Sequence, residues 1–294
     1  YSNKSLKKDY SNSKCQRPIN TNGPLQCFEG KGYSSKEKIY FTGDIMHNKF
    51  FIFDNQFVWT GSANISDTGT GGYNANNIIV IDSPFIASKY LNEFNKMYEG
   101  NFHRSKDKNR KDEAKREKIS IDIDSSEVVL LFSPQNYVME KVERLIEDSE
   151  KTIDLSIFFL TYNKVVKKLV DAHERNVKVR VIIDATGASN GYSKHQYLRD
   201  KGIDVKVENW GGKMHMKTAI IDNKHIVIGS MNWTKAGVTK NDENTLIIKN
   251  DFENSMNLTL FFNKMWDSIP RKWLTEDPEA ESLDSINSCN DNVD

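Results

Sequence analysis

The chain has 294 residues, of which 37% are hydrophobic and 28% are charged. This composition is typical of a globular protein and excludes a largely disordered one, and no apolar run approaches the ~20 residues needed to span a bilayer. The formal net charge is zero, but residues 274–294 carry seven acidic and no basic side chains, so residues 1–273 hold 41 basic and 34 acidic ones. That mild basic excess favours an anionic substrate.

The first hundred residues contain one stretch with a clear pattern. Residues 1–40 are rich in Ser, Asn, Lys and Gly and are expected to be largely loop. They lead into MHNKFFIFDNQFVWTGSANIS at residues 46–66. Further along, the mixed charge run HRSKDKNRKDEAKREK at residues 103–118 is typical of a solvated connector or an exposed helix, with an arm that binds nucleic acid as the alternative.

The remaining chain alternates between strand and helix patterns. Ser133 and Pro134 are expected to begin a helix that runs to about Glu150. The elements expected after it are strands at residues 152–160, 177–184, 203–207, 215–222, 225–229 and 245–249, and helices at residues 164–175, 194–201 and 253–266. Strands that alternate with helices predict an α/β/α sandwich around a mixed sheet.

The chain also repeats itself. The stretch MHMKTAIIDNKHIVIGSMNWT at residues 214–234 aligns with residues 46–66 without a gap when 168 is added to each number. Ten of the 24 positions from 41 to 64 are identical, and the same offset carries FNKM at residues 94–97 onto FNKM at residues 262–265. One spacing held over more than fifty residues predicts a tandem repeat of one fold.

The first copy is shorter than the second. Only 46 residues precede His47, too few for a counterpart of the strand, helix and strand that open the second copy before His215. We therefore expect two tandem modules with mixed sheets, related by a pseudo-twofold axis, the first of them N-terminally incomplete. The expected division is a first module at 1–102, a charged linker at 103–123, a second module at 124–273 and an acidic tail at 274–294. The site would be complete within one chain, which favours a monomer.

In each copy a histidine and a lysine are two residues apart, as His47 and Lys49 and as His215 and Lys217. On a strand this spacing places both side chains on one face. Histidine suits nucleophilic or acid–base chemistry near neutral pH, and lysine supplies a positive charge for an anionic oxygen. The Gly-Ser-x-Asn that follows in each copy adds further donors. Two copies that face each other would form one site suited to a phosphodiester reaction without a metal or another cofactor.

The spacing H-x-K, four residues, Asp, six residues, Gly-Ser-x-Asn resembles the signature of the phospholipase D superfamily, often called the HKD family. Both copies match it in full, and the resemblance covers roughly residues 41–98 and 125–268. It implies a two-step displacement at phosphorus, in which one histidine attacks to form a phosphohistidine and the other protonates the leaving alcohol.

The resemblance also implies a role for each motif residue. The expected catalytic residues are His47, His215, Lys49, Lys217, Asn64, Asn232 and Glu243. Among them, the lysines and asparagines are expected to hold the phosphoryl oxygens. Residues expected around the bound substrate are Ser62, Ser230 and Trp233, and residues expected to be structural are Asp54, Asp222, Gly61 and Gly229. No metal ligand is expected.

Members of this family usually carry a carboxylate beyond Gly-Ser-x-Asn that orients a histidine, and Glu243 in NDEN fits that position. The constant offset pairs it with Ala75, so the first copy lacks the carboxylate. In relatives with two copies this acid reaches across the axis, which implies that Glu243 supports His47. His47 is then expected to be the nucleophile and His215 the acid. If the carboxylate instead serves its own copy, the two roles exchange.

The histidines outside the motifs are weaker candidates. His225 is expected to pack in the core or at an edge, and solvent-exposed positions are expected for His103, His173 and His195. The large aromatic side chains are expected in the core, although Trp233 follows the motif directly and is a candidate to line the cleft.

Three cysteines and the C-terminus bear on the compartment. Cys15, Cys27 and Cys289 are too scattered for a metal site, and Cys15 and Cys27 are either a disulfide in an exported protein or free thiols. The ending SINSCNDNVD is similar to the start of the calcium-binding repeats of some exported bacterial proteins, but an acidic disordered terminus is the expected state. The chain begins with Tyr rather than Met, so the missing secretory signal excludes no compartment; export is slightly favoured over the cytoplasm.

Three functions remain open at this point. A nuclease is favoured, because each copy is compact, like the small bacterial and mitochondrial family members that cut nucleic acid, and because residues 1–273 are net basic. The alternative is a phospholipase D or phospholipid transferase that acts on cardiolipin or another phosphatidyl headgroup. Such enzymes usually have longer insertions and apolar loops around the cleft, which this sequence does not show. The third is an inactive phosphate-binding module, which the complete set of His and Lys disfavours.

Overall fold

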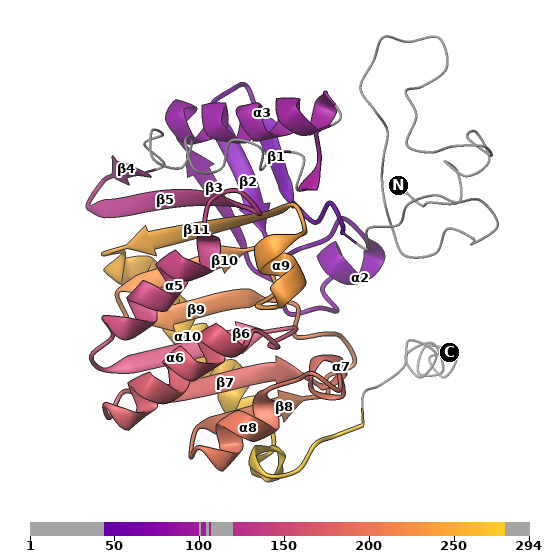
Figure 1. Ribbon diagram of the computed structural model, residues 1–294, viewed down its shortest axis with the longest axis vertical. Coiled ribbons are helices and arrows are strands. Elements are labelled where there is room, and N and C mark those ends of the chain that lie inside the picture. Colours follow the sequence, from indigo (N-terminus) through magenta and orange to yellow (C-terminus); the bar gives the residue numbers. More distant parts are fainter. Residues whose placement is uncertain (1–43, 100, 104–105, 107–119, 280–294) are drawn as a thin grey trace, which may run out of the picture.

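The structure is a computed structural model that describes residues 44–99, 101–103, 106 and 120–279 (Figure 1). The expectations for residues 1–40, for most of the charged linker, for the three cysteines and for the last fifteen residues lie outside the described part of the chain. Below, the first copy of the repeat means residues 44–99, and the second copy means residues 120–274.

The first copy contains strands β1 (Phe50–Phe53), β2 (Phe57–Gly61) and β3 (Ile78–Asp82), and helices α2 (Asp67–Thr70) and α3 (Pro84–Tyr98). The second copy contains strands β4 (Ser120–Ile123), β5 (Ser126–Ser133), β6 (Thr152–Ile157), β7 (Lys178–Asp184), β8 (Asp204–Glu208), β9 (Lys217–Ile221), β10 (His225–Gly229) and β11 (Glu243–Lys249). Its helices are α5 (Val138–Glu147), α6 (Asn163–Glu174), α7 (Ala185–Ala188), α8 (His195–Asp200), α9 (Lys235–Thr239) and α10 (Phe252–Ser268), followed by a 3-10 turn, η2 (Arg271–Leu274).

The second copy is built on an eight-stranded sheet in the order β4-β5-β11-β10-β9-β6-β7-β8. The pairs β6–β7 and β7–β8 are parallel, and the others are antiparallel. The parallel strands are joined through helices, as this geometry requires. The mixed sheet predicted from the sequence is confirmed.

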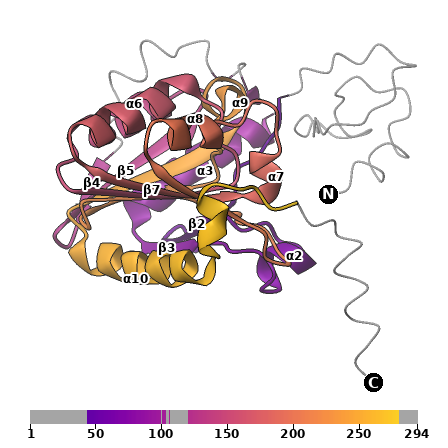
Figure 2. The ribbon, with the colours of Figure 1, turned by 90° about the horizontal axis from the view of Figure 1, so that it is seen from below.

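Helices cover both faces of this sheet. Seen from below, α6 and α8 lie on one side of the strands and α10 on the other (Figure 2). Helix α5 turns Val142 and Ile146 into the same core as α6, since apolar residues four apart share one helix face. Helix α10 packs Phe262 and Met265 against Ile220 on the opposite face. The result is the three-layer α/β/α arrangement.

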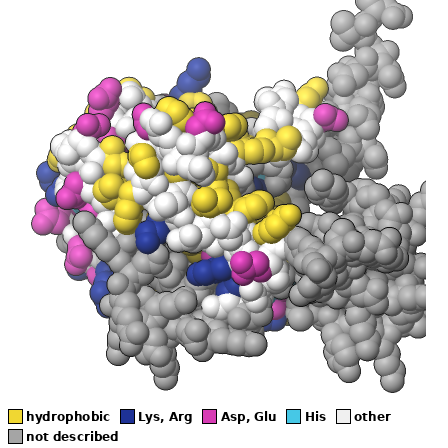
Figure 3. Space-filling view, turned by 90° about the horizontal axis from the view of Figure 1, so that it is seen from above, with side chains coloured by type: hydrophobic (Ala, Val, Ile, Leu, Met, Phe, Trp, Pro, Cys, Tyr) yellow, Lys and Arg dark blue, Asp and Glu magenta, His cyan; other side chains and the backbone are white. Residues whose placement is uncertain are grey.

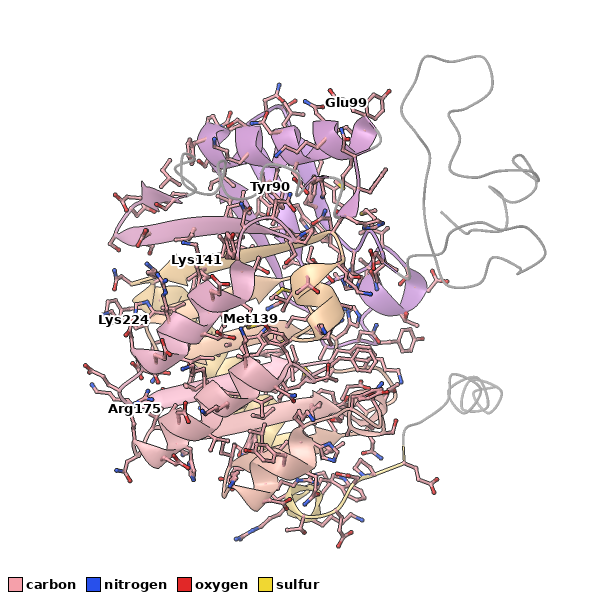
Figure 4. All side chains as sticks on the ribbon, in the orientation of Figure 1. Tyr90, Glu99, Met139, Lys141, Arg175 and Lys224 are labelled. Atoms are coloured by element: carbon pink, nitrogen blue, oxygen red, sulfur yellow. The ribbon has the colours of Figure 1, made fainter. Side chains whose placement is uncertain are left out.

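The first copy is a three-stranded antiparallel sheet, β1-β2-β3, with α3 beside it. Its inner face and the large sheet form one core from equivalent positions of the two copies, such as Val58 with Ile226 and Ile81 with Ile248. Tyr90 of α3 is fully buried there and packs edge-on against Phe50 at 4.8 Å between ring centroids (Figure 4). This shared core fixes how the two motifs face each other.

The outer face of the small sheet exposes Phe51, Phe53 and Val80. Equivalent positions in the second copy belong to the core beneath α5 and α6, as Ile221 does for Phe53. Among the described residues no helix pair covers this face of the first copy. Hydrophobic side chains are also visible at the surface of this end of the molecule, where α3 lies (Figure 3).

Two boundaries differ from those expected. Residues 128–132 alternate between the cores on the two faces of the sheet, so this segment is a strand. Ser133 is its last residue and pairs with Glu243, and the helix begins only at Val138. The motif histidines lie just outside the strands, since β1 begins at Phe50 and β9 at Lys217.

Both motif hairpins turn in the same way. Asp54 and Asn55 have positive φ angles of 53° and 55°, and Asp222 and Asn223 have 56° and 50°. Positive φ at both central residues matches the twist of antiparallel strands, and Asn and Asp tolerate it. The Asp222 carboxylate also accepts hydrogen bonds from the backbone nitrogens of residues 150–152 at 2.7–2.9 Å. These contacts support a structural role for the aspartate.

Candidate active site

The two motifs meet through backbone hydrogen bonds that cross between the copies. The His47 nitrogen donates to the Asp242 oxygen at 2.8 Å, and the His215 nitrogen donates to the Ala75 oxygen at 2.9 Å. Each histidine is therefore held by the segment that follows Gly-Ser-x-Asn in the other copy. This reciprocity is what a pseudo-twofold axis through the site produces.

His47 is oriented by a carboxylate of the second copy. Its Nδ1 lies 2.7 Å from Oε2 of Glu243, a residue that is 1% exposed. The same oxygen accepts from the Ser230 hydroxyl at 2.7 Å, and Oε1 accepts from the Asn241 amide at 3.1 Å. A carboxylate held in this way fixes the proton of His47 on Nδ1 and leaves Nε2 with a free lone pair.

His215 is oriented by an amide of the first copy. Its Nδ1 lies 3.1 Å from Oδ1 of Asn76 and 3.1 Å from the backbone oxygen of Ser62. The Ser62 hydroxyl donates to the same Asn76 oxygen at 2.9 Å, as Ser230 does to Glu243. Asn76, and not Ala75, therefore occupies the position of Glu243 in the first copy.

The pairing with Ala75 was wrong by one residue. The nitrogens of Ser62 and Ser230 donate to the backbone oxygens of Asn77 and Asn244, so the offset is 167 in the strands that follow the loop, whereas it is 168 in the two motifs and again in FNKM. One residue has been gained or lost between residues 64 and 76, and the ungapped alignment does not detect it. The expectation that the first copy lacks the carboxylate still holds, because an amide stands in its place.

Each lysine lies beside its own histidine. The ammonium nitrogens of Lys49 and Lys217 donate to the backbone oxygens of His47 and His215 at 2.9 and 2.6 Å. Lys217 also lies 5.2 Å from the ring centroid of Phe158, which packs against the His215 ring at the same separation. Both lysine side chains are buried, so their charges act in a medium of low polarity.

The asparagines and glycines of the motifs complete the frame. Asn232 accepts from the Phe159 nitrogen at 3.3 Å through Oδ1, which leaves its NH₂ group for an anionic oxygen, and Asn64 is exposed. A Cβ on Gly61 would lie 2.1 Å from the Asn77 oxygen, and one on Gly229 would lie 2.2 Å from the Asn244 oxygen. Only glycine permits the close approach that brings the next segment to the histidine of the other copy.

Comparison with known proteins agrees with this geometry. The profile of the cardiolipin synthase, PLD-like domain family matches residues 2–98 and 142–266, which is most of the chain and both motifs. The chain belongs to the phospholipase D superfamily.

Individual relatives match part of the chain. The mitochondrial cardiolipin hydrolase of Chlamydomonas reinhardtii is 32% identical over 117 residues, which are 40% of this chain and 52% of that protein. The phospholipase D of Rickettsia conorii is 30% identical over 128 residues, 44% of this chain and 64% of that protein. The chain thus spans about half to two thirds of these relatives.

One solved structure shares this fold. The phosphatidylserine synthase of Haemophilus influenzae Rd KW20 superposes with a TM-score of 0.62 at 16% identity, covering 84% of this chain and 68% of that one. At this identity the likeness concerns the fold alone.

Three expectations for residues around the substrate need correction. Trp233 is 1% exposed and packs in the core with α5 and α6, so it does not line a cleft. Ser62 and Ser230 are fully buried, and their hydroxyls hold Asn76 and Glu243. They therefore position the residues that hold the histidines instead of contacting a substrate.

Four basic groups share this small site, and burial, together with their mutual repulsion, lowers their pKa values. Burial lowers the pKa of Lys49 to about 8, and burial followed by the charge of Lys49 lowers that of Lys217 well below its usual range. Burial, then Lys217, Lys49 and His47, lower the pKa of His215 to about 2. Burial also lowers the pKa of His47, although Glu243 opposes that shift. Because the charge of His47 acts on His215, and those of Lys49 and Lys217 act on both rings, the four groups belong to one site, which an anion would stabilise.

A buried pair of carboxyl groups behind His215 was missed from the sequence. Asp184 and Glu208 both accept from the Met214 nitrogen, at 3.0 and 2.8 Å, and Glu208 also accepts from the Trp210 nitrogen at 2.9 Å. Burial, and then a hydrogen bond with Asp184 and its charge, raise the pKa of Glu208 to about 8. Glu208 therefore holds a proton near neutral pH. Acidic residues at the ends of the neighbouring strands β7 and β8 were the available signal.

This pair predicts a dependence of stability on pH. A raised pKa means that the contribution of Glu208 is fully present below its unfolded value near 4.5 and is lost as pH rises through about 8. The free energy of unfolding is expected to fall by a few kcal/mol between pH 5 and pH 9. Glu208→Gln, which keeps a hydrogen bond to Asp184 without the second charge, should flatten this slope. Urea unfolding at both pH values measures it, with Glu253→Gln, an exposed site on α10, as the matched control. Equal slopes in all three proteins would contradict the raised pKa of Glu208.

A second buried network, made of ion pairs, centres on Asp242, the residue before Glu243. The fully buried carboxylate of Asp242 pairs with Nδ1 of His103 at 2.8 Å and with Lys106, which also pairs with Glu93 of α3. His103 is 9% exposed, so the expected solvent-exposed position was wrong. The start of the charged linker is thereby tied to the segment that holds His47.

The remaining histidines lie away from the motifs. His195 is buried, against expectation, with Nδ1 2.9 Å from the Ser193 hydroxyl and Nε2 2.8 Å from Asp277. His225 lies at the start of β10, where it accepts from the Asn250 nitrogen at 3.2 Å, and His173 is half-buried on α6.

In the described part of the chain, no three or more of His, Cys, Asp and Glu gather in a way that could hold a metal ion. No described helix is long and apolar enough to cross a bilayer.

Proposed function

We propose that the protein hydrolyses phosphodiesters through a covalent phosphohistidine on His47. The observation that carries the proposal is the unequal support of two histidines in one site: Nδ1 of His47 faces a carboxylate, and Nδ1 of His215 faces an amide. A carboxylate stabilises the positive imidazole that forms when Nε2 attacks phosphorus. An uncharged amide leaves the other ring free to gain and lose a proton.

The reaction follows in two balanced steps. Nε2 of His47 attacks phosphorus, the bond to the leaving alcohol breaks, and the alcohol oxygen takes the proton from Nε2 of His215. Neutral His215 then removes a proton from water, whose oxygen attacks the phosphohistidine and returns His47 with its lone pair. Splitting one displacement into two lowers each barrier. Lys49, Lys217 and the Asn232 amide would bind the phosphoryl oxygens as their charge increases. None of these steps requires a metal ion.

We take nucleic acid as the first candidate substrate. The support is the net charge, since residues 1–273 carry 41 basic and 34 acidic side chains, and a basic protein attracts the phosphate backbone. The exposed aromatic ring of Tyr73, two residues before Ala75, is suited to stack on a base.

A phospholipid headgroup is the second candidate. Relatives named mitochondrial cardiolipin hydrolase and phospholipase D support it. Two exposed apolar side chains beside the motifs also support it. Met46 directly precedes His47 and is 37% exposed, and Ile65 directly follows Asn64 and is 64% exposed. Apolar side chains beside an anion site suit a substrate that joins a phosphate to acyl chains.

The test compares three diesters in the presence of EDTA. They are single-stranded DNA with a labelled end, vesicles of cardiolipin in phosphatidylcholine, and bis(p-nitrophenyl) phosphate, which depends on neither base nor acyl contacts. The wild-type protein is expected to hydrolyse the nitrophenyl diester and to cut DNA, and the His47→Ala variant to do neither. Release of phosphatidic acid from the vesicles with intact DNA would select the phospholipid candidate. No hydrolysis of any of the three would contradict the proposal and favour a phosphate-binding module.

A further inference from the structure

Asn76 and Glu243 form a matched pair that differs in charge. Each accepts a hydrogen bond from the serine of its own copy, Ser62 at 2.9 Å and Ser230 at 2.7 Å. Each faces Nδ1 of the histidine of the other copy, at 3.1 and 2.7 Å. The two copies thus place an oxygen acceptor at the same point behind each histidine, and one of the two carries no charge.

The orientation of the Asn76 amide is determined by its other contact. Its Nδ2 donates to the backbone oxygen of Gly69 at 2.9 Å, so the oxygen end must face His215. His215 consequently carries its proton on Nδ1, the same tautomer that Glu243 enforces in His47. Both rings direct Nε2 to the shared site, and geometry alone does not distinguish them.

Charge does distinguish them. The positive groups that act on His215 are Lys217, Lys49 and His47, and the acceptors on its Nδ1 are the uncharged oxygens of Asn76 and Ser62. Among the described residues, neither hydrogen-bond partner of the His215 Nδ1 carries a negative charge, whereas the partner of the His47 Nδ1 is the carboxylate of Glu243. An anionic diester would supply the missing negative charge while it is bound.

We infer that Asn76 is the positioning residue that gives the reaction its direction. This rests on the proposed function. By providing an acceptor without a charge, Asn76 keeps His215 in the tautomer needed for proton transfer but prevents it from becoming a second nucleophile. His215 then holds a proton only while substrate is bound and releases it readily to the leaving group.

The isosteric substitution Asn76→Asp tests this inference. A carboxylate at this point should raise the pKa of His215, because an opposite charge in contact favours the protonated ring. As the general acid must be protonated, activity is lost as pH rises through its pKa, so the alkaline limb of kcat should move upward by about 1–3 pH units. The shift is expected with a dialkyl or nucleic-acid diester, whose leaving group needs a proton, and not with bis(p-nitrophenyl) phosphate. A merely structural role for Asn76 would lower both rates without moving the limb.

Exchanging the charged and the uncharged acceptor between positions 76 and 243 provides the second readout. In Asn76→Asp combined with Glu243→Gln, the phosphate trapped by an alkaline denaturing quench, in which the bond from phosphorus to imidazole survives, and located by mass spectrometry should move from His47 to His215. Asn76→Ala is the control, because it removes the acceptor without adding charge; it should slow turnover while the label stays on His47. If the aspartate variants fail to fold because they lose the bond to Gly69, Glu243→Gln alone decides: the label on His47 should fall at least tenfold.

The outcomes separate this inference from the proposed function. Absence of a trapped phosphohistidine in the wild-type protein would reject both. The role of Asn76 alone would be overturned by three results together. The wild-type protein would carry the label on His47, the alkaline limb of kcat would not move in Asn76→Asp, and the label would stay on His47 in the double variant. For the Glu243→Gln variant, an unchanged yield on His47 would contradict the unequal support of the two histidines, on which both the inference and the choice of His47 as nucleophile rest.

Discussion

Replacing His47 by alanine is expected to abolish formation of the covalent intermediate, whereas replacing His215 by alanine should trap it. The reason is the division of labour that Glu243 and Asn76 impose. Without His47 no ring attacks phosphorus, and turnover should fall on the order of 10⁴-fold. Without His215 the attack on bis(p-nitrophenyl) phosphate survives, since nitrophenolate leaves without a proton, but no base activates water for the second step.

A rapid-quench experiment measures this difference. His215→Ala should release about one nitrophenolate per enzyme molecule in a burst and then stop, with phosphate on His47. The matched control is His225→Ala, which removes a histidine outside the site and should turn over at the wild-type rate. A burst in His47→Ala, with label on His215, would reverse the two assignments.

Replacing Lys217 by methionine is expected to lower activity and to raise stability at the same time. The side chain is 2% exposed, and its ammonium group is held by the His215 oxygen and by the face of Phe158. Loss of the charge that meets the phosphoryl oxygen should lower kcat by about 10²–10³-fold. The burial that lowers its pKa well below the usual range also destabilises the folded protein, since a charge in this position is poorly solvated.

The sign of the stability effect follows from the direction of that shift. A lysine whose pKa is lowered on folding contributes most above its unfolded pKa, and its contribution is lost as pH falls. Lys217→Met should therefore gain most at acidic pH, by about 1–3 kcal/mol in the free energy of unfolding. Urea titrations at pH 6 and pH 9 measure it, with Lys167→Met on the exposed side of α6 as the control. A destabilised Lys217→Met protein at pH 6 would show that the ammonium group is well paired in the fold.

The sequence alone was sufficient for the repeat and the superfamily, and it named the candidate site residues. His47, Lys49, His215 and Lys217 could be named because identical residues recur at one spacing, and strands such as β7 and β10 followed from short apolar runs bounded by turns. Such local signals persist in the sequence because strand patterning and turn chemistry act over a few neighbouring residues.

The tertiary structure decided what depends on contacts between distant residues. It placed Asn76 instead of Ala75 behind His215, because a loop can absorb one extra residue while the hydrogen bonds of Ser62 keep their register. It also moved Trp233 from the cleft to the core and paired His103 with Asp242. Charge and burial at a given point are set by the elements that pack there, and the spacing of residues along the chain does not record them.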